Sequence, residues 1–102
     1  MKYKIVKSSP YQDWLNKQPL KEQFQIEKRI SQIEHEGYFG ENKLLGNDLL
    51  ELKWSGGRRI YYTVHENVIV LLLFGGNKNG QTQDINQARK ILKKYLEASQ
   101  KK

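Results

Sequence analysis

The chain changes from strand to helix within residues 68–85, which read VIVLLLFGGNKNGQTQDI. The first seven residues have no polar interruption, a pattern typical of a strand covered on both faces. The two glycines that follow end the strand, and Asp84 with Gln87 three residues later indicates a helix N-terminus. A strand, a polar loop and a helix therefore follow one another, and loops held in this way often carry binding and catalytic groups.

Two more strands are predicted upstream of the apolar run. Apolar and polar residues alternate over 49–54, and a glycine-containing turn leads into a second alternating segment over 58–65. Successive strand residues point to opposite faces of a sheet. Ile60, Tyr62 and Val64 are therefore expected on the same face as Leu50, Leu52 and Trp54 of the preceding strand. We expect an antiparallel meander whose apolar face is covered by helices.

The N-terminal half predicts a short strand over 3–7 and then a helical hairpin. Ser9 fits the N-cap of the first helix, with Pro10 at its first position. Gly37 is placed to end the second helix, and residues 38–47 are interpreted as a connection. The positions expected to face the core at helical spacing are Tyr11, Trp14 and Leu15 in the first helix and Phe24, Ile26, Ile30 and Ile33 in the second.

These elements predict an α+β fold in one domain that spans residues 1–102. The chain is long enough to close one modest core, and nothing in its composition marks a boundary. The final helix is expected to turn an apolar stripe toward the sheet, formed by Ile85, Ala88, Ile91, Leu92, Tyr95 and Leu96.

The composition narrows the partner and the compartment. Lysine and arginine number 18 against 11 aspartate and glutamate residues, so the formal net charge is +7 and we expect an anionic partner. A positive field attracts nucleic acid, an acidic protein or a membrane surface alike. The chain has no cysteine, the apolar run is far shorter than the roughly 20 residues that span a bilayer, and the first residues lack the apolar core of a signal peptide. These features favour a cytoplasmic protein without a membrane span.

The second face of the alternating strands is basic, and we expect it to be exposed. Alternation places Lys53 there from one strand and Arg59 and Tyr61 from the next, while Lys78 extends the surface beyond the apolar run. Three cations and a tyrosine suit a phosphodiester backbone, although cations on a solvated face often have no specific partner. Arg58 points to the covered face by alternation, but its place beside the turn could let it reach around the edge.

The sequence gives little indication of a catalytic site built from histidines or of a metal site built from histidines and carboxylates. His35 stands between two glutamates near a helix end, and His65 lies at a strand end. With no cysteine and no carboxylate cluster, neither a histidine-based nuclease site nor a metal site is expected, and no cofactor is predicted.

A further set of motifs follows a fixed order along the chain. After the helical hairpin come Glu51-Leu52-Lys53, GRRIYY (57–62), LLLFGGNK (71–78), Gln81, Asp84-Ile85 and Ala88. This ordered set resembles the RelE/ParE toxin superfamily, in particular its HigB-like, phage Gp49-like branch, over about Trp14 to Leu92. The resemblance implies a small, curved, mostly antiparallel sheet with a helical hairpin packed on it.

The resemblance also implies function and partners. Many members are ribosome-dependent messenger-RNA endonucleases held inactive by a cognate antitoxin, which in this branch is often a helix-turn-helix, HigA-like repressor. Others inhibit DNA gyrase. The chain is therefore expected to be a type II toxin whose partners are an antitoxin, the ribosome and mRNA; the alternatives are a gyrase-inhibiting binder and a degenerate toxin that cleaves nothing.

Two departures from the branch pattern give the degenerate alternative some weight. Lys53 stands where the branch usually has arginine, and Asn77 stands where an aspartate is common. Lysine keeps the positive charge but cannot bind a phosphate through two parallel hydrogen bonds, as arginine can.

For a ribonuclease, the resemblance implies attack by the RNA 2′-hydroxyl on the adjacent phosphate, without a metal. Such a reaction needs a proton acceptor, charge stabilisation on the phosphoryl oxygens and a proton donor. Lys53 is expected to accept the proton or contact phosphate, Arg59 to stabilise the transition state, and Tyr61 to stack on a base or donate a proton. The remaining expected RNA or phosphate contacts are Arg58, Lys78 and Gln81.

Overall fold

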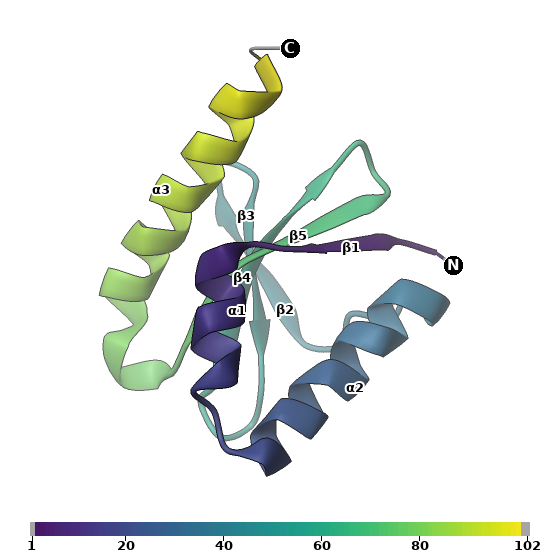
Figure 1. Ribbon diagram of the computed structural model, residues 1–102, viewed down its shortest axis with the longest axis vertical. Helices are drawn as coiled ribbons and strands as arrows, with labels where there is room; N and C mark the ends of the chain where they lie inside the picture. Colours follow the sequence, from purple (N-terminus) through teal and green to yellow (C-terminus); the bar gives the residue numbers. More distant parts are fainter. Residues whose placement is uncertain (1, 101–102) are drawn as a thin grey trace.

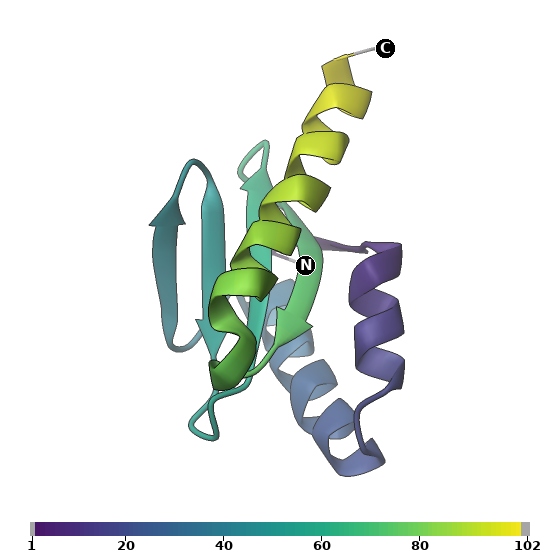
Figure 2. The same cartoon turned by 90° about the vertical axis from the view of Figure 1, so that its left-hand side faces the viewer.

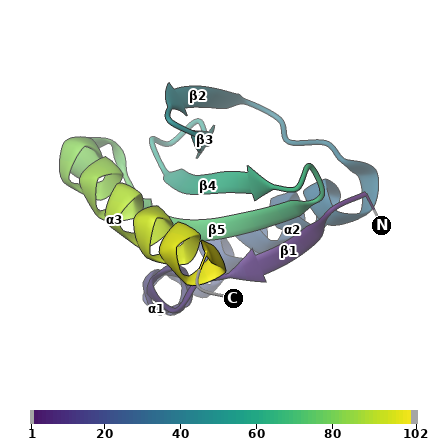
Figure 3. The same cartoon turned by 90° about the horizontal axis from the view of Figure 1, so that it is seen from above.

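The structure, a computed structural model, describes residues 2–100 and has an α+β fold (Figure 1). Its five strands form one sheet in the order β1-β5-β4-β3-β2, which the view from above shows directly (Figure 3). β1 runs parallel to β5, and the other neighbouring pairs are antiparallel, which confirms the predicted fold class. The elements are β1 Lys4–Lys7, α1 Ser9–Asn16, α2 Leu20–Glu36, β2 Asn42–Gly46, β3 Leu49–Lys53, β4 Arg59–His65, β5 Ile69–Gly76, the 3-10 helix η1 Lys78–Gly80 and α3 Gln81–Gln100.

The α1–α2 hairpin covers one face of the sheet, as predicted. Gly37 ends α2 in the left-handed conformation, with φ of 73°. Burying one large apolar side chain contributes about 1.5–3 kcal/mol, so this layer supplies much of the folding free energy. Its buried residues are Tyr11, Leu15, Ile26, Ile30 and Ile33 from the hairpin and Leu52, Ile60, Tyr62, Val70 and Leu72 from the sheet.

The start of α1 differs from the sequence prediction by one residue. Ser8, not Ser9, is the N-cap: its Oγ accepts a hydrogen bond from the Tyr11 backbone N–H at 3.1 Å. The same hydroxyl donates to the Leu73 carbonyl at 2.8 Å. Ser8 is therefore selected over Ser9 because its side chain joins α1 to β5 as well as capping the helix.

Phe24 does not face the core, contrary to the prediction. Its side chain is 77% exposed, while Ile26 and Ile30 on the same helix are buried. At 3.6 residues per turn, Ile26, Ile30 and Ile33 follow one stripe of α2, whereas Phe24 stands two residues before Ile26 and six before Ile30 and points to another side of the helix. The exposed Phe24 lies beside the equally exposed Leu20 at the start of α2.

The segment 38–47, which the sequence suggests is only a connection, contains the strand β2. β2 pairs antiparallel with β3, with an irregularity between Leu44 and Gly46. Its backbone pairing fixes it in place, although it forms the outer edge of the sheet and Leu44 is 64% exposed. A short edge strand with few apolar residues gives a weak alternation signal.

The second face of the sheet is covered by α3 and is not an open surface, so that prediction was wrong. In Figure 2, α3 crosses in front of the strands, α1 stands to their right, and α2 lies behind and below them. A second core forms beneath α3 because its apolar stripe needs an apolar partner. The buried members of this core are Leu49, Tyr61, Leu73, Ala88, Ile91 and Leu92.

α3 begins at Gln81, three residues before the predicted cap Asp84. The preceding turn is η1, where the Asn77 side chain accepts a hydrogen bond from the Asn79 N–H. Asp84 instead packs against Gly76, where any side chain would collide with its carboxylate, and burial raises the pKa of this carboxyl group. None of the helices within residues 2–100 has the length and apolar character needed to cross a bilayer.

Candidate functional site

Three cations come together where three segments meet at one end of the sheet. Lys53 at the end of β3 pairs in register with Arg59 at the start of β4, and Arg59 pairs with Gly76 at the end of β5. The turn between β3 and β4 approaches the start of η1 closely, because a Cβ placed on Gly57 would lie 3.3 Å from the Lys78 Cβ. Strand pairing and this close approach therefore bring together Lys53, Arg59 and Lys78, which we call the cation cluster, while Arg58 stands next to Arg59 in the chain with its side chain on the other face of the sheet.

Arg59 is fixed from below by a buried carboxylate. Its Nε lies 3.3 Å from Glu51 Oε1, and its Nη1 donates to the Gly57 carbonyl at 3.2 Å. The Glu51 side chain is 1% exposed and that of Arg59 10%. The second Glu51 oxygen accepts a hydrogen bond from the Gln81 amide at 3.0 Å. Glu51 thus holds both the guanidinium and the first residue of α3 in one arrangement.

Lys53 and Lys78 are the accessible members of the cation cluster. The Lys53 side chain is 34% exposed, and its Nζ lies 3.8 Å from Glu41 Oε2, a separation at which exposed ion pairs add little stability. Lys78 is exposed in η1. The backbone under Lys53 is fixed by Arg29, which donates to the Lys53 carbonyl. Two ammonium groups that solvent can reach therefore accompany one buried, hydrogen-bonded guanidinium.

Tyr61 lies inside the α3 core, so the expectation that it is exposed was wrong. The residue is 0% exposed, and its hydroxyl is buried without a hydrogen-bond partner among the described residues. Burial, with the neighbouring Glu51 and Asp84 charges, raises the pKa of Tyr61 to about 12. The phenol is therefore protonated at neutral pH and is closed to a stacking base in this arrangement.

Arg58 lies on the hairpin side of the sheet, as alternation predicted, and its Nη2 is 3.5 Å from Glu22 Oε1 of α2. The pair belongs to a pocket of about 230 Å³ between the hairpin and the β3–β4 turn, whose other side chains are Trp14, Gln18 and Asn77. Glu22 was not predicted as a site residue, because no local signal in the sequence tells which residue of α2 lies opposite the turn.

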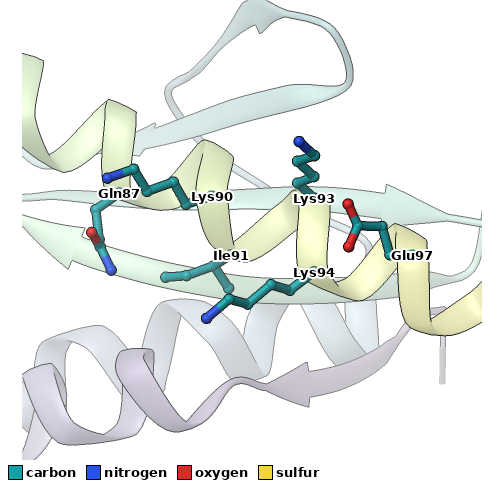
Figure 4. Close-up of a pocket in the computed structure, with 6 residues that line it drawn as sticks. All are labelled: Gln87, Lys90, Ile91, Lys93, Lys94 and Glu97. Atoms are coloured by element: carbon teal, nitrogen blue, oxygen red, sulfur yellow. The ribbon is translucent and has the colours of Figure 1, made fainter.

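α3 carries a second basic surface that the sequence analysis did not single out. A shallow pocket of about 340 Å³ runs along the helix, and its side chains project from the ribbon in Figure 4. Their spacing of three and four residues places them on neighbouring helix positions and was the available signal. The lining residues are Gln87, Lys90, Ile91, Lys93, Lys94 and Glu97.

Comparison with solved structures identifies the class of fold. A variant of the Escherichia coli toxin RelE in the free state superimposes with a TM-score of 0.70, at 22% identity over 88% of this chain and 97% of that one. The Mycobacterium tuberculosis toxin–antitoxin complex RelBE2 gives 0.63 at 15% identity, over 76% and 99% of the two chains. The protein has the fold of the RelE toxins, as the sequence resemblance implied.

The sequence comparison is more specific. Residues 13–96 match the family described as phage derived protein Gp49-like, and the chain belongs to that family. An uncharacterised protein of Haemophilus influenzae is 33% identical over 92 residues, which cover 87% of this chain and 92% of the relative. The predicted Gp49-like branch is confirmed.

Proposed function

We propose that this protein is the toxin of a type II toxin–antitoxin pair and that it inhibits translation by cutting mRNA on the ribosome. The observation that carries the proposal is the cation cluster: three positive side chains from three segments at one end of a RelE-type sheet. Such a group of cations suits a bent phosphodiester backbone, because each cation can contact a different phosphoryl oxygen.

The reaction is a transesterification within the RNA. The 2′-hydroxyl loses its proton and attacks the adjacent phosphorus, the bond to the 5′-oxygen breaks, and that oxygen takes up a proton. The products are a 2′,3′-cyclic phosphate and a 5′-hydroxyl, so water is not consumed in this step. Positioning and electrostatic stabilisation by the protein and the ribosome supply the rate enhancement.

Each cluster residue has a role that follows from its environment. Arg59 stabilises the negative charge on the phosphoryl oxygens, because Glu51 and Gly57 hold its guanidinium in a fixed orientation. Lys78 contacts phosphate. Lys53 contacts phosphate or accepts the 2′-proton.

Gln81 and Tyr61 lie on the α3 side of the sheet, next to the cation cluster. The Gln81 amide donates to Glu51 and so positions Arg59, in place of the direct RNA contact expected from sequence. Tyr61 contacts RNA only if α3 moves, because α3 encloses the ring. Its protonated hydroxyl then suits the role of proton donor to the departing 5′-oxygen.

The partners follow from the same surface. The net charge of +7 and the lysines of α3 attract ribosomal RNA from a distance. A cognate antitoxin would silence the protein by covering the cation cluster, and an acidic antitoxin segment complements its charge. The solved relatives include the intact E. coli RelBE toxin–antitoxin complex, which supports a partner of this kind.

The test is induced expression in a bacterial host, with transcript 5′ ends mapped shortly after induction. Arg59→Lys is the informative variant, because it keeps a positive charge beside Glu51 and removes the planar guanidinium. Arg89→Lys is the matched control: Arg89 donates to the Leu45 and Gly46 carbonyls of β2, outside the cation cluster. We expect growth arrest and new cuts within translated frames for wild type and Arg89→Lys, and loss of both for Arg59→Lys. Growth arrest without RNA cuts would indicate gyrase as the target. Absence of growth arrest, although the protein is expressed in soluble form, would indicate a degenerate toxin.

A further inference from the structure

We propose that the pocket between the hairpin and the β3–β4 turn binds a guanine base of the RNA, next to the phosphate held by the cation cluster. The inference rests on the proposed RNA substrate and adds a base preference to it. The pocket is built by α1, α2, the turn and the end of β5, so residues far apart in sequence form it together.

The chemical match lies in the pair Arg58 and Glu22, whose charged groups stand side by side at 3.5 Å. A carboxylate accepts hydrogen bonds through two oxygens, and a guanidinium only donates. Guanine presents two adjacent donors, N1–H and the N2 amino group, beside the O6 acceptor. Among the four RNA bases only guanine has two neighbouring donors for one carboxylate, and arginine commonly recognises its O6.

The negative charge of Glu22 decides between a base and a phosphate as occupant. A carboxylate within the pocket repels a phosphate group, whereas it accepts hydrogen bonds from a base. The Glu22 side chain is 33% exposed and that of Arg58 is 18% exposed, so both groups are partly withdrawn from water and remain reachable. Their partial burial strengthens the discrimination between a matching and a mismatched base edge.

The size and walls of the pocket also suit one base. A volume of about 230 Å³ is below the range of roughly 300–1,000 Å³ typical of pockets for larger organic ligands. Trp14 supplies an aromatic wall, and bases in single-stranded RNA commonly stack on such side chains. A side chain at Gly75 would collide with the Trp14 ring, so this glycine permits the position of the wall.

The pocket adjoins the cation cluster through the backbone. Arg58 precedes Arg59, and their side chains lie on opposite faces of the sheet. Asn77 lines the pocket, and the next residue, Lys78, belongs to the cluster. A nucleotide whose phosphate contacts the cluster can therefore place its own or a neighbouring base into the pocket around the end of the sheet.

The test measures binding of trinucleotides that cannot be cut. Purified protein labelled with ¹⁵N is titrated with 2′-O-methyl RNA trinucleotides that carry G, A, C or U in the middle and are otherwise identical. We expect the G trinucleotide to bind about tenfold or more tightly than the other three, with shifts of the Trp14 indole and the Asn77 side-chain amide. Equal affinity for all four bases, or shifts that avoid the pocket, would overturn the inference.

The decisive variant is Glu22→Gln, which keeps the side-chain shape and removes one acceptor and the charge. Its matched control is Glu27→Gln on the same helix, where Glu27 pairs with Lys7 and lies outside the pocket. Glu22→Gln should bind all four trinucleotides within about twofold of one another, while Glu27→Gln keeps the wild-type preference. A preference for G that survives in Glu22→Gln would remove Glu22 from base recognition and overturn the inference.

The binding experiment separates this inference from the proposed cleavage, because a 2′-O-methyl group removes the attacking hydroxyl. Guanine-selective binding without cuts in cells would leave the pocket standing and contradict the nuclease. Cuts in cells without guanine-selective binding would support the nuclease and contradict the assignment of the pocket to guanine. If only an antitoxin fragment shifts the pocket resonances, the pocket is a protein-docking site and the base assignment is wrong.

Discussion

The two faces of the sheet differ in what their buried residues do. The face under α1 and α2 is closed mainly by apolar side chains, such as Ile26, Leu52 and Ile60. The face under α3 combines an apolar core with the buried charges of Glu51 and Arg59. A substitution in the apolar core under the hairpin should therefore change stability alone, whereas one at the buried charges beside α3 should change stability and activity together.

The largest effect is expected when Arg59 is replaced by alanine, because Glu51 would remain buried without its cation. Removing one partner of a buried ion pair typically costs about 3–5 kcal/mol, and urea unfolding should show a loss of that order. The double variant Glu51→Leu with Arg59→Met should recover most of the loss, because it removes both charges. A loss below about 1 kcal/mol for Arg59→Ala would show that water already screens the pair.

A substitution in the apolar core under the hairpin tests the other face of the sheet. Ile33 is 0% exposed, and Ile33→Ala should lower the free energy of unfolding by about 2–4 kcal/mol through the lost transfer free energy and the cavity left behind. Its folded fraction should cut RNA at the wild-type rate, because the residue belongs to the hairpin core and contributes no side chain to the cation cluster. The measurement is urea unfolding combined with cleavage activity per folded molecule. A folded but inactive Ile33→Ala protein would contradict the separation of the two faces.

Tyr61→Phe separates packing from chemistry on the α3 face. The Tyr61 hydroxyl is buried without a partner in the described part of the chain, so its removal should leave stability unchanged or raise it by up to about 1 kcal/mol. Loss of cleavage with stability retained would assign the phenol a chemical role. A clear loss of stability at neutral pH would show that the hydroxyl has a partner after all.

The same variant makes a prediction about alkaline pH. Burial raises the pKa of Tyr61 and Tyr62 from 10.0 to about 12, so the folded state retains protons that the unfolded state loses. The stability contributed by the protonated phenols is fully present below pH 10 and is lost as pH rises toward 12. Tyr61→Phe should lose less stability over this window in denaturant titrations. Equal losses for the two proteins would contradict the raised Tyr61 pKa.

The smallest effect is expected on the outer side of the hairpin. Phe24 is 77% exposed, and Phe24→Ala should change the free energy of unfolding by no more than about 0.5 kcal/mol. Chemical denaturation checks this value, and a loss above 2 kcal/mol would place the ring in the core as the sequence first suggested.

Alternation in the strands was enough to predict one face of the sheet in detail. Leu52, Ile60 and Tyr62 share a face with the hairpin as predicted, because a two-residue period fixes relative side-chain direction. The same period placed Tyr61 on the opposite face correctly but could not tell that α3 covers it. What covers a face depends on where a distant helix packs, and local periodicity does not contain that information.

In the candidate site, too, the sequence predicted what local patterns determine and missed what depends on the packing of distant elements. Its cations were found from sequence because Lys53, Arg59 and Lys78 lie at element ends that the strand order brings together. The residues that hold or extend the site, such as Glu51 beneath Arg59 and Glu22 beside Arg58, were not assigned those roles. Both act across packed layers, so their roles emerge only once the layers are placed.

The most direct test of the central claim uses purified ribosomes programmed with a short message in two forms. One form is all ribose, and the other has a 2′-deoxy nucleotide immediately 5′ of the cut. We predict that wild type cuts only the ribose message, leaving a 2′,3′-cyclic phosphate, and that Arg59→Lys is slower by about 100-fold or more. Equal cutting of the deoxy message, undiminished cutting by Arg59→Lys, or no cutting by folded wild-type protein would contradict the account.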